Sequence, residues 1–429
     1  DQPRSRGLGD VYKRQFLEIL DLKYFDLKYF YFLFLINTNI SFAQFLPPSV
    51  AFHHKKTASI SEESYATLLN NGAYGQVTWS KNMSTYSVSM WVKSRDSDPD
   101  NWKAFFSTHH PNNGGFQIDS DGNYRYRMLS TEGSATFGNN SLKTTWDHVG
   151  VVADGSVTRL YFNGVLANTG NWVESDWNGI WVGRNRLADM PGDYYLDEVR
   201  VWEDVALTQA DIQAWMHKPL DNSHPNYSDL AVYFQMNSNS ISGTTLLDVS
   251  GNSNNAQLFN TSGISNATSN VPVVDLISSY QTDVEGIWTS TGTSDSEASD
   301  GLSMSVGSAL AEANFVVFGN NNDDTGTTSS SLSGISKRSE REWNFDEKGT
   351  VTADIKIDIS DATGHSGSIS AASNYKLLFK TCELCTFSEV ETGDSVSGDV
   401  ITFSSVAIQD GIYSIACLLY TSPSPRDRG

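Results

Sequence analysis

Two groups of aspartates have the residue type and spacing to bind a hard cation. Residues 96–100 (DSDPD) place three carboxylates at alternate positions directly after an alternating apolar run, and oxygen ligands of this kind suit calcium. The spacing is not that of an EF-hand, because Asn101 stands where that loop needs glycine. The alternative is that each group is a solvated acidic turn. The candidate calcium ligands are Asp96, Asp98 and Asp100, with Asp189 and Asp193 as the second group.

Aromatic side chains in loops are the candidates for ligand contact. Three tryptophans fall in predicted loops, and a His-His pair lies in another loop beside two asparagines. A flat ring with a few polar neighbours can hold a sugar, whereas a buried tryptophan stabilises a small sandwich through its large apolar area. Both outcomes stay open for each ring. The candidate ligand-binding residues are Trp102, Trp172, Trp177, His109 and His110.

Paired carboxylates are what hydrolysis of a glycosidic bond would need. A retaining hydrolase uses two carboxyl groups about 5 Å apart, and on one strand these must share a face. Asp197 and Glu198 are adjacent, so strand alternation is expected to point them to opposite faces. The sequence also lacks Gly-x-Ser-x-Gly, His-Glu-x-x-His and a phosphate-binding glycine loop. We therefore predict no catalytic residues and a chain that is not an enzyme.

The cysteines and the net charge limit the kinds of chemistry and of binding partner that the chain could have. Cys382 and Cys385 form a lone C-x-x-C pair without a surrounding β-α-β pattern, so we expect a local turn that a strained disulfide could close. The formal net charge is −21, which disfavours nucleic acid and anionic membranes as partners. An acidic surface suits a soluble extracellular protein.

The two ends of the chain share a signature of DNA origin. When residues 5–15 are back-translated, the complementary strand, read one base in, encodes residues 417–426. One short element at both ends in opposite orientation is typical of a translated sequencing adapter. We therefore assign residues 1–15 and 417–429 to adapter-derived scars and interpret the chain as a fragment.

Residues 16–43 are predicted to contain a signal peptide. Lysines precede the apolar run 30–36, and the small residues of Ser41-Phe42-Ala43 follow it. A run of seven apolar residues is too short to span a bilayer. The sequence therefore predicts a secreted or cell-surface protein with no membrane span in the mature chain.

The rest of the sequence has the pattern of an all-β protein. In residues 86–93 (YSVSMWVK) apolar and other side chains alternate, as on a strand with one buried face. The dipeptides at 121–122 (DG), 154–155 (DG) and 163–164 (NG) lie between such runs and tolerate the positive φ of tight hairpins. One short helix is expected, with Thr208 as its cap and Asp211 at the capping-box position.

The order of the motifs resembles a known family. The segments are 89–93 (SMWVK), 115–122 (GFQIDSDG), 146–149 (WDHV), 160–164 (LYFNG), 180–183 (IWVG), 196–202 (LDEVRVW) and 243–252 (GTTLLDVSGN). This series resembles the laminin-G-like jelly-rolls of the concanavalin A-like superfamily. The last segment could instead open a second copy, but we favour closure of the first module because no further SMWVK or WDHV follows.

The expected domains are a laminin-G-like jelly-roll at 60–262, a linker at 263–275 and a second, smaller β-sandwich at 276–416, which resembles a module of secreted bacterial surface proteins. The resemblance implies a secreted binding module for a glycan or an extracellular protein, assisted by calcium at the rim. The alternatives are a purely structural surface or stalk component and, less favoured, a glycoside hydrolase on the same fold. The oligomeric state is not predicted.

Overall fold

The computed structural model describes residues 65–69, 72–95, 103–108, 115–130, 133–185, 193–291, 301–322, 326–365, 369 and 371–418. These residues belong to one compact unit, 59–429. The predicted N-terminal scar and signal peptide lie outside the described residues. No helix in the described part of the chain is long and apolar enough to cross a membrane.

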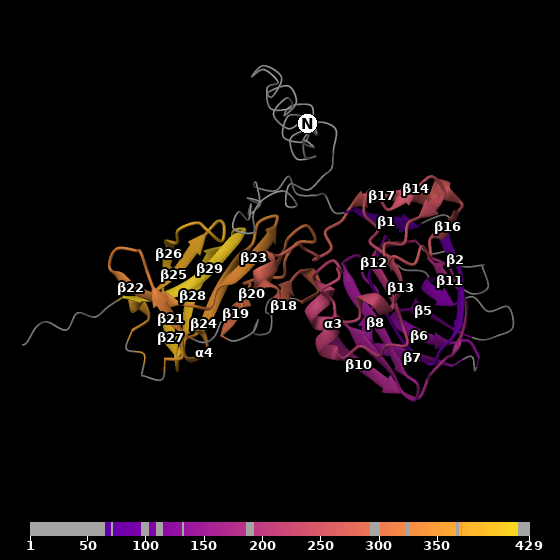
Figure 1. Cartoon of the computed structure of the whole chain (residues 1–429), viewed down its shortest axis with the longest axis horizontal. Helices are drawn as coiled ribbons and strands as arrows, with labels where there is room; N and C mark the ends of the chain where they lie inside the picture. The colour runs from indigo at the N-terminus through magenta and orange to yellow at the C-terminus, as the bar shows by residue number, and fades with distance from the viewer. Residues whose placement is uncertain are drawn as a thin grey trace, which may run out of the picture. The chain divides into compact units, whose positions relative to one another are not determined.

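The first sandwich consists of two curled antiparallel sheets, which confirms the predicted fold class (Figure 1). Sheet 1 contains, in spatial order, β10 (Val165–Gly170), β9 (Thr158–Phe162), β8 (Asp147–Asp154), β3 (Thr85–Ser94), β12 (Tyr194–Glu203), β1 (Tyr65–Leu69) and β17 (Ile264–Thr268), with β13 (Leu230–Phe234) also paired to β12. Sheet 2 contains β14 (Ile241–Ser242), β15 (Thr245–Leu246), β16 (Ala256–Phe259), β2 (Tyr74–Asn82), β11 (Asp176–Val182), β4 (Ala104–Thr108), β5 (Phe116–Asp121), β6 (Asn123–Met128) and β7 (Ser134–Ser141).

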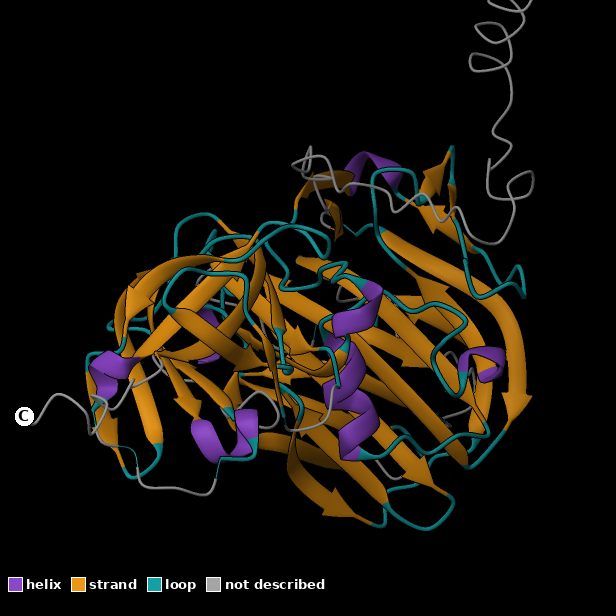
Figure 2. Ribbon diagram, turned by 60° about the vertical axis from the view of Figure 1, so that its left-hand side comes forward, coloured by secondary structure: helices purple, strands orange, loops and turns teal. Residues whose placement is uncertain are grey.

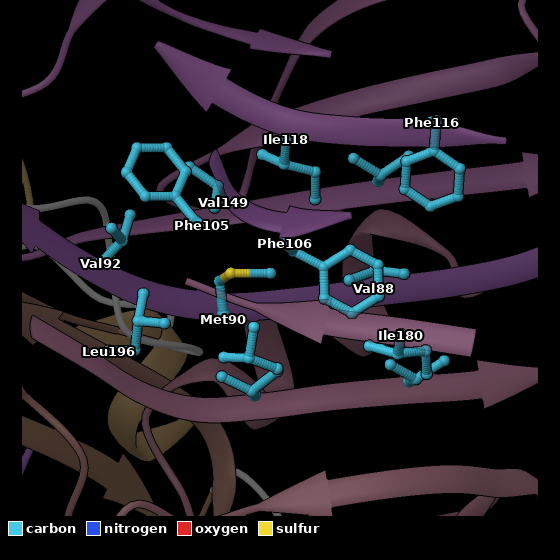
Figure 3. Close-up of a cluster of buried hydrophobic side chains, with 14 of the residues drawn as sticks. Val88, Met90, Val92, Phe105, Phe106, Phe116, Ile118, Val149, Ile180 and Leu196 are labelled. Carbon is cyan, nitrogen blue, oxygen red and sulfur yellow. The ribbon is translucent and has the colours of Figure 1, made fainter. Parts of the chain in front are cut away.

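The core lies between these sheets because every second residue of each strand points inward. Val88 and Met90 of sheet 1 meet Phe106, Ile118 and Ile180 of sheet 2, and all five are at most 1% exposed (Figure 3). The alternation predicted for residues 86–93 is therefore confirmed. Burial of side chains of this size contributes about 1.5–3 kcal/mol each.

The predicted hairpin turns occupy the predicted places. The dipeptides at 121–122, 154–155 and 163–164 connect β5 to β6, β8 to β9 and β9 to β10. Gly122, Gly155 and Gly164 have φ angles of 79°, 88° and 76°. These values lie in the left-handed region that glycine adopts without a steric penalty, so the turn chemistry fixes the register of all three strand pairs.

The chain returns to close the first sandwich, as predicted, instead of opening a second copy. β16 pairs with β2, and β17 pairs with β1. Asp248 holds the return segment: its carboxylate accepts hydrogen bonds from the backbone N–H groups of Tyr233 (2.9 Å), Ser250 (2.9 Å) and Asn254 (2.8 Å). The linker predicted at 263–275 is partly wrong, because residues 264–268 form β17.

A second sandwich follows. Its larger sheet contains β18 (Thr282–Ile287), β20 (Phe315–Asn320), β23 (Trp343–Lys348), β29 (Gly411–Leu418), β22 (Ile335–Ser339) and β21 (Thr327–Ser329), with β25 (Tyr375–Lys380) on β29 and β26 (Ser388–Thr392) on β25. Its smaller sheet contains β19 (Leu302–Ser305), β24 (Thr352–Asp358), β28 (Val400–Ala407) and β27 (Ser395–Ser397), followed in sequence after β24 by helix α4 (Ile359–Thr363). β29 runs two residues beyond the boundary predicted at 416. Cys382 and Cys385 form a disulfide in the turn before β26, so the expected turn is present.

Helix α3 (Gln209–Met216) is the predicted short helix. Thr208 Oγ1 accepts a hydrogen bond from Asp211 N (3.1 Å), and the Asp211 carboxylate accepts one from Thr208 N (2.8 Å), which completes the capping box. The helix packs on the outside of sheet 1 and also contacts β18 of the second sandwich (Figures 1 and 2).

An apolar cluster joins the two sandwiches on the outer side of sheet 1. Trp288 is 5% exposed and contacts Trp91 edge to face, with ring centroids 5.4 Å apart. Its indole N–H donates to the carbonyl of Trp146 at 3.0 Å. The other members come from both sandwiches and from the chain between them: Met216, Val271, Val274, Leu276, Val284, Phe315 and Val317.

His217 lies in the same contact region and should make the chain less stable in acid. Its Nδ1 lies 2.7 Å from the carbonyl oxygen of Pro272, so Nδ1 carries the proton and the ring is neutral. Burial lowers the pKa of His217 to about 4. In the unfolded chain the ring takes up a second proton, on Nε2, near pH 6.5. Stability from His217 is therefore complete above that pH and is lost as the pH falls toward 4.

We expect His217→Gln to reduce this acid sensitivity. Between pH 7 and pH 5 the wild-type free energy of unfolding should fall by about 2 kcal/mol more than that of the variant, because glutamine does not titrate. Urea denaturation at the two pH values measures the difference. Equal losses in both proteins would show that His217 does not contribute.

Candidate functional site

Only three of the ten predicted site residues fall within the described part of the chain. Trp172, Trp177 and Asp193 are described. Outside the described residues lie the seven others: Asp96, Asp98, Asp100, Trp102, His109, His110 and Asp189.

Trp177 is a core residue, so its assignment to a ligand-binding loop is wrong. It lies in β11, is 2% exposed and makes edge contacts with Tyr86 (5.0 Å) and Phe116 (5.2 Å). Trp172 does lie in a loop, but it is half-buried and packs against the same core. Its carbonyl accepts a hydrogen bond from Tyr126 Oη at 2.9 Å. Neither ring therefore presents an open face to a ligand in the way we expected.

Among the described residues, Asp193 pairs with a cation. Arg95 Nη1 lies 3.5 Å from its carboxylate, and Arg95 N donates to Asp193 O at 3.2 Å. No group of three or more His, Cys, Asp or Glu side chains that could hold a metal occurs among the described residues. Calcium therefore stays a prediction.

Asp197 and Glu198 do not point to opposite faces, contrary to the expectation from alternation. The register between β12 and β3 shifts between Asp197 and Arg200, and Glu198 has φ 51°. This bulge leaves Leu196 and Val199 in the core and turns both acids to the outer side of sheet 1. There Ser269 Oγ donates to Asp197 at 2.9 Å.

Both acids are buried structural groups. Burial and the neighbouring charge of Glu198 raise the pKa of Asp197 well above its usual value. Burial also raises the pKa of Glu198, which Arg200 opposes. Glu198 accepts from Arg200 Nη2 (2.5 Å) and Tyr233 Oη (2.6 Å), and Arg200 donates onward to the carbonyls of Trp215 (2.9 Å) and Lys218 (2.6 Å). The ion pair of Glu198 with Arg200 therefore anchors the last turn of α3 and the segment that follows it.

The outer face of sheet 2 carries a row of side chains set by strand register. Residues that face one another on adjacent strands lie on the same side of the sheet and about 4.8 Å apart. Across six strands, from β16 to β6, the row consists of Gln257, Gln76, Trp181, Ser107, Gln117 and Arg127. This polar row therefore spans about 24 Å. Ser107, Gln117 and Trp181 are buried, so the row is open at its two ends, at Gln257 and Gln76 and at Arg127.

At one end of the row the rings gather into an aromatic patch, which we define as Tyr74, Trp181 and Phe259 with Arg184. Tyr74 stacks on Phe259 with centroids 4.8 Å apart and an angle of 11°. The Arg184 guanidinium lies 4.1 Å from the centroid of Tyr74 and 4.6 Å from that of Trp181. Phe259 is 38% exposed, whereas Trp181 is 6% exposed, so the patch has a buried base and an open rim.

Toward the other end an ionic cluster stiffens the row. Asp119 is fully buried and accepts from Arg125 Nε at 2.7 Å and from the Gln117 amide. Arg125 also donates to Asp121 at 2.9 Å. Burial raises the pKa of Asp119, although Arg125 lowers it in part. The cluster therefore holds planar polar groups in fixed orientations on β5 and β6, at the end of the row away from the aromatic patch.

These outer-face residues were not among the sequence predictions. Their outward direction follows from alternation within each strand, but the row depends on β11 pairing with both β2 and β4, which are separated from it by about 70–100 residues in the chain. The only signal in the sequence was the aromatic content of segments 74–79 and 177–181.

Comparison with protein families agrees with the resemblance of the first sandwich. Residues 69–213 match the family model Laminin_G_3, the concanavalin A-like lectin/glucanases superfamily. Residues 277–412 match a domain of unknown function, DUF8202. No curated protein matches the chain.

Solved structures with a similar fold include three from bacteria. A Bacteroides ovatus protein whose proposed role is carbohydrate binding is 19% identical, with a TM-score of 0.40, over 49% of this chain and 61% of that protein. Domain 4 of the extracellular arabinanase AbnA of Geobacillus stearothermophilus, solved with arabinotriose, is 23% identical (TM-score 0.29; 33% of this chain, 72% of that one). The CBM40 of the Ruminococcus gnavus IT-sialidase is 12% identical (TM-score 0.27; 34% and 91%). The chain thus spans about three fifths of the first relative's length.

Proposed function

We propose that the first sandwich, whose residues 69–213 match the concanavalin A-like lectin/glucanases superfamily, is an extracellular module that binds carbohydrate on the outer face of sheet 2. The observation that carries the proposal is the aromatic patch beside the polar row. The outer side of sheet 1 is covered by α3 and the second sandwich, whereas Thr78, Gln257 and Phe259 are exposed on sheet 2.

Binding would combine two kinds of contact. The apolar C–H face of a sugar ring can lie against an aromatic ring, which loses little conformational freedom because it has only two side-chain torsions. Gln76 and Arg184 can donate hydrogen bonds to hydroxyl groups, each with a net contribution of about 0.5–1.5 kcal/mol. Gln257 Nε2 already donates to the carbonyls of Thr244 and Leu258, so Gln257 offers its side-chain oxygen as an acceptor. Calcium belongs to this proposal as an additional ligand near Asp193.

Removal of Tyr74 tests the site. We expect Tyr74→Ala to weaken binding to any glycan that the wild-type chain captures on a glycan array by at least about tenfold, because the stacked pair with Phe259 is lost. The array should be run with calcium and with a chelator, and affinities confirmed by calorimetry. Tyr227→Ala is the matched control. Tyr227 is also half-buried, but it packs against a separate apolar cluster on the outer side of sheet 1, which includes Trp202 and Leu220.

Two outcomes would contradict the proposal. One is that no glycan binds with or without calcium. The other is that Tyr74→Ala and Tyr227→Ala weaken binding equally. The first outcome would favour a structural surface component. The burial of Trp177 and the extensive contact between the sandwiches also fit that alternative.

A further inference from the structure

A cleft of about 450 Å³ lies where edge strand β10, helix α3 and strand β18 meet. Its size falls within the usual range of small-molecule sites. One wall comes from the first sandwich and the other from the second. It lies outside sheet 1, so it is separate from the aromatic patch on sheet 2.

The walls of the cleft combine flat apolar groups with uncharged polar groups and one carboxylate. Phe162 and Trp288 provide ring surface, and Asn140, Gln213, Glu285 and Ser290 provide polar atoms. Asn140 uses its amide N–H on Phe137 O (2.7 Å), which leaves its carbonyl oxygen as an acceptor. Gln213 is half-buried and has no hydrogen bond through its side chain within the described part of the chain, so both ends of its amide can serve a ligand.

The charge of the cleft excludes one class of ligand. No lysine or arginine lines it among the described residues, and Glu285 is its one carboxylate there. His217 also lines it, and burial lowers the pKa of its ring to about 4, so the ring is neutral near pH 7. An anionic ligand would therefore meet no compensating charge, whereas hydroxyl groups could pair with the amides and the carboxylate.

Exposed apolar side chains mark the mouth of the cleft. Val165 and Leu166 on β10 are 57% and 45% exposed. Both line the cleft, and together they form an apolar rim beside its polar atoms. A neutral ligand that has both hydroxyl groups and an apolar C–H face suits this arrangement better than a charged one.

From this geometry we infer that the cleft between β10, α3 and β18 is a second binding site, for a neutral mono- or disaccharide, to which the second sandwich contributes Glu285, Trp288 and Ser290. The role of the second sandwich is then to complete a ligand site. The inference does not depend on sheet 2 being a carbohydrate site, since the two sites share no residue.

A bulky residue at the rim tests the cleft in the full chain. The probe is a panel of neutral mono- and disaccharides, with glucuronate as the anionic member, observed by saturation-transfer NMR. In the Tyr74→Ala protein at least one neutral sugar should still bind, and glucuronate should not. Adding Leu166→Trp should then weaken that binding at least tenfold, because the indole fills the mouth of the cleft.

The matched control is Val249→Trp, which adds the same ring at a position that is 39% exposed and away from the cleft. The inference fails if Leu166→Trp and Val249→Trp bind the sugar equally, if no neutral sugar binds the Tyr74→Ala protein, or if glucuronate binds as tightly as the neutral sugars. Failure of the sheet 2 proposal looks different: Tyr74→Ala would then leave all binding at the wild-type level.

Discussion

Trp288→Ala should uncouple the two sandwiches and lower the free energy of unfolding by about 3–5 kcal/mol. The indole is 5% exposed and contacts Trp91 and His217, with centroid distances of 5.4 Å and 5.2 Å. Its loss leaves a cavity between two rings and removes the hydrogen bond to Trp146 O. In calorimetry we expect the single transition of the wild type to split into two.

Two further variants separate the causes of this effect. Trp288→Phe keeps a ring in place but loses the N–H donor and part of the ring volume, so it should cost about 1–2 kcal/mol and keep one transition. Trp172→Ala removes a half-buried ring that packs on the first core alone, so it should lower stability without splitting the transition. If Trp288→Ala unfolds in one transition at nearly the wild-type temperature, the sandwiches are not held together through Trp288.

Local patterns in the sequence predict most of the first sandwich. Alternation in residues 86–93 and the Asp-Gly and Asn-Gly turns act over a few residues, so they are legible without knowledge of the partner strands. β17 was missed because its sequence, ISNAT, is too polar to look like a strand. Its pairing to β1 depends on a partner some 200 residues earlier in the chain.

The differences at Trp177 and at Asp197 with Glu198 both occur beside β-bulges. In β11 the register shifts between Asn178 and Ile180, so Trp177 and Ile180, three residues apart, both face the core. In β12 the shift after Asp197 puts two adjacent acids on one side. A bulge resets the alternation by one residue, and nothing in a single sequence marks where that occurs. The outer-face row was missed for another reason, because it depends on pairing between distant strands.

The buried Arg200 gives the other large expected effect. Arg200→Met should lower the free energy of unfolding by about 3–5 kcal/mol, because it leaves Glu198 without its cation and the carbonyls of Trp215 and Lys218 without their donor. The exposed pair of Arg159 with Asp154 (2.8 Å) is the matched control, and Arg159→Met should cost less than about 1 kcal/mol.

The pH dependence identifies the cause of this loss. Without Arg200, the folded-state pKa of Glu198 rises further above its unfolded value. A raised carboxyl pKa stabilises the protonated folded form, so the cost of Arg200→Met should be smaller near pH 5 and larger near pH 8. Adding Glu198→Gln should restore part of the stability at pH 8, because the unpaired charge is gone. A cost that is the same at both pH values, with no recovery in the double variant, would mean that Arg200 acts through packing and its carbonyl contacts and not through the charge of Glu198.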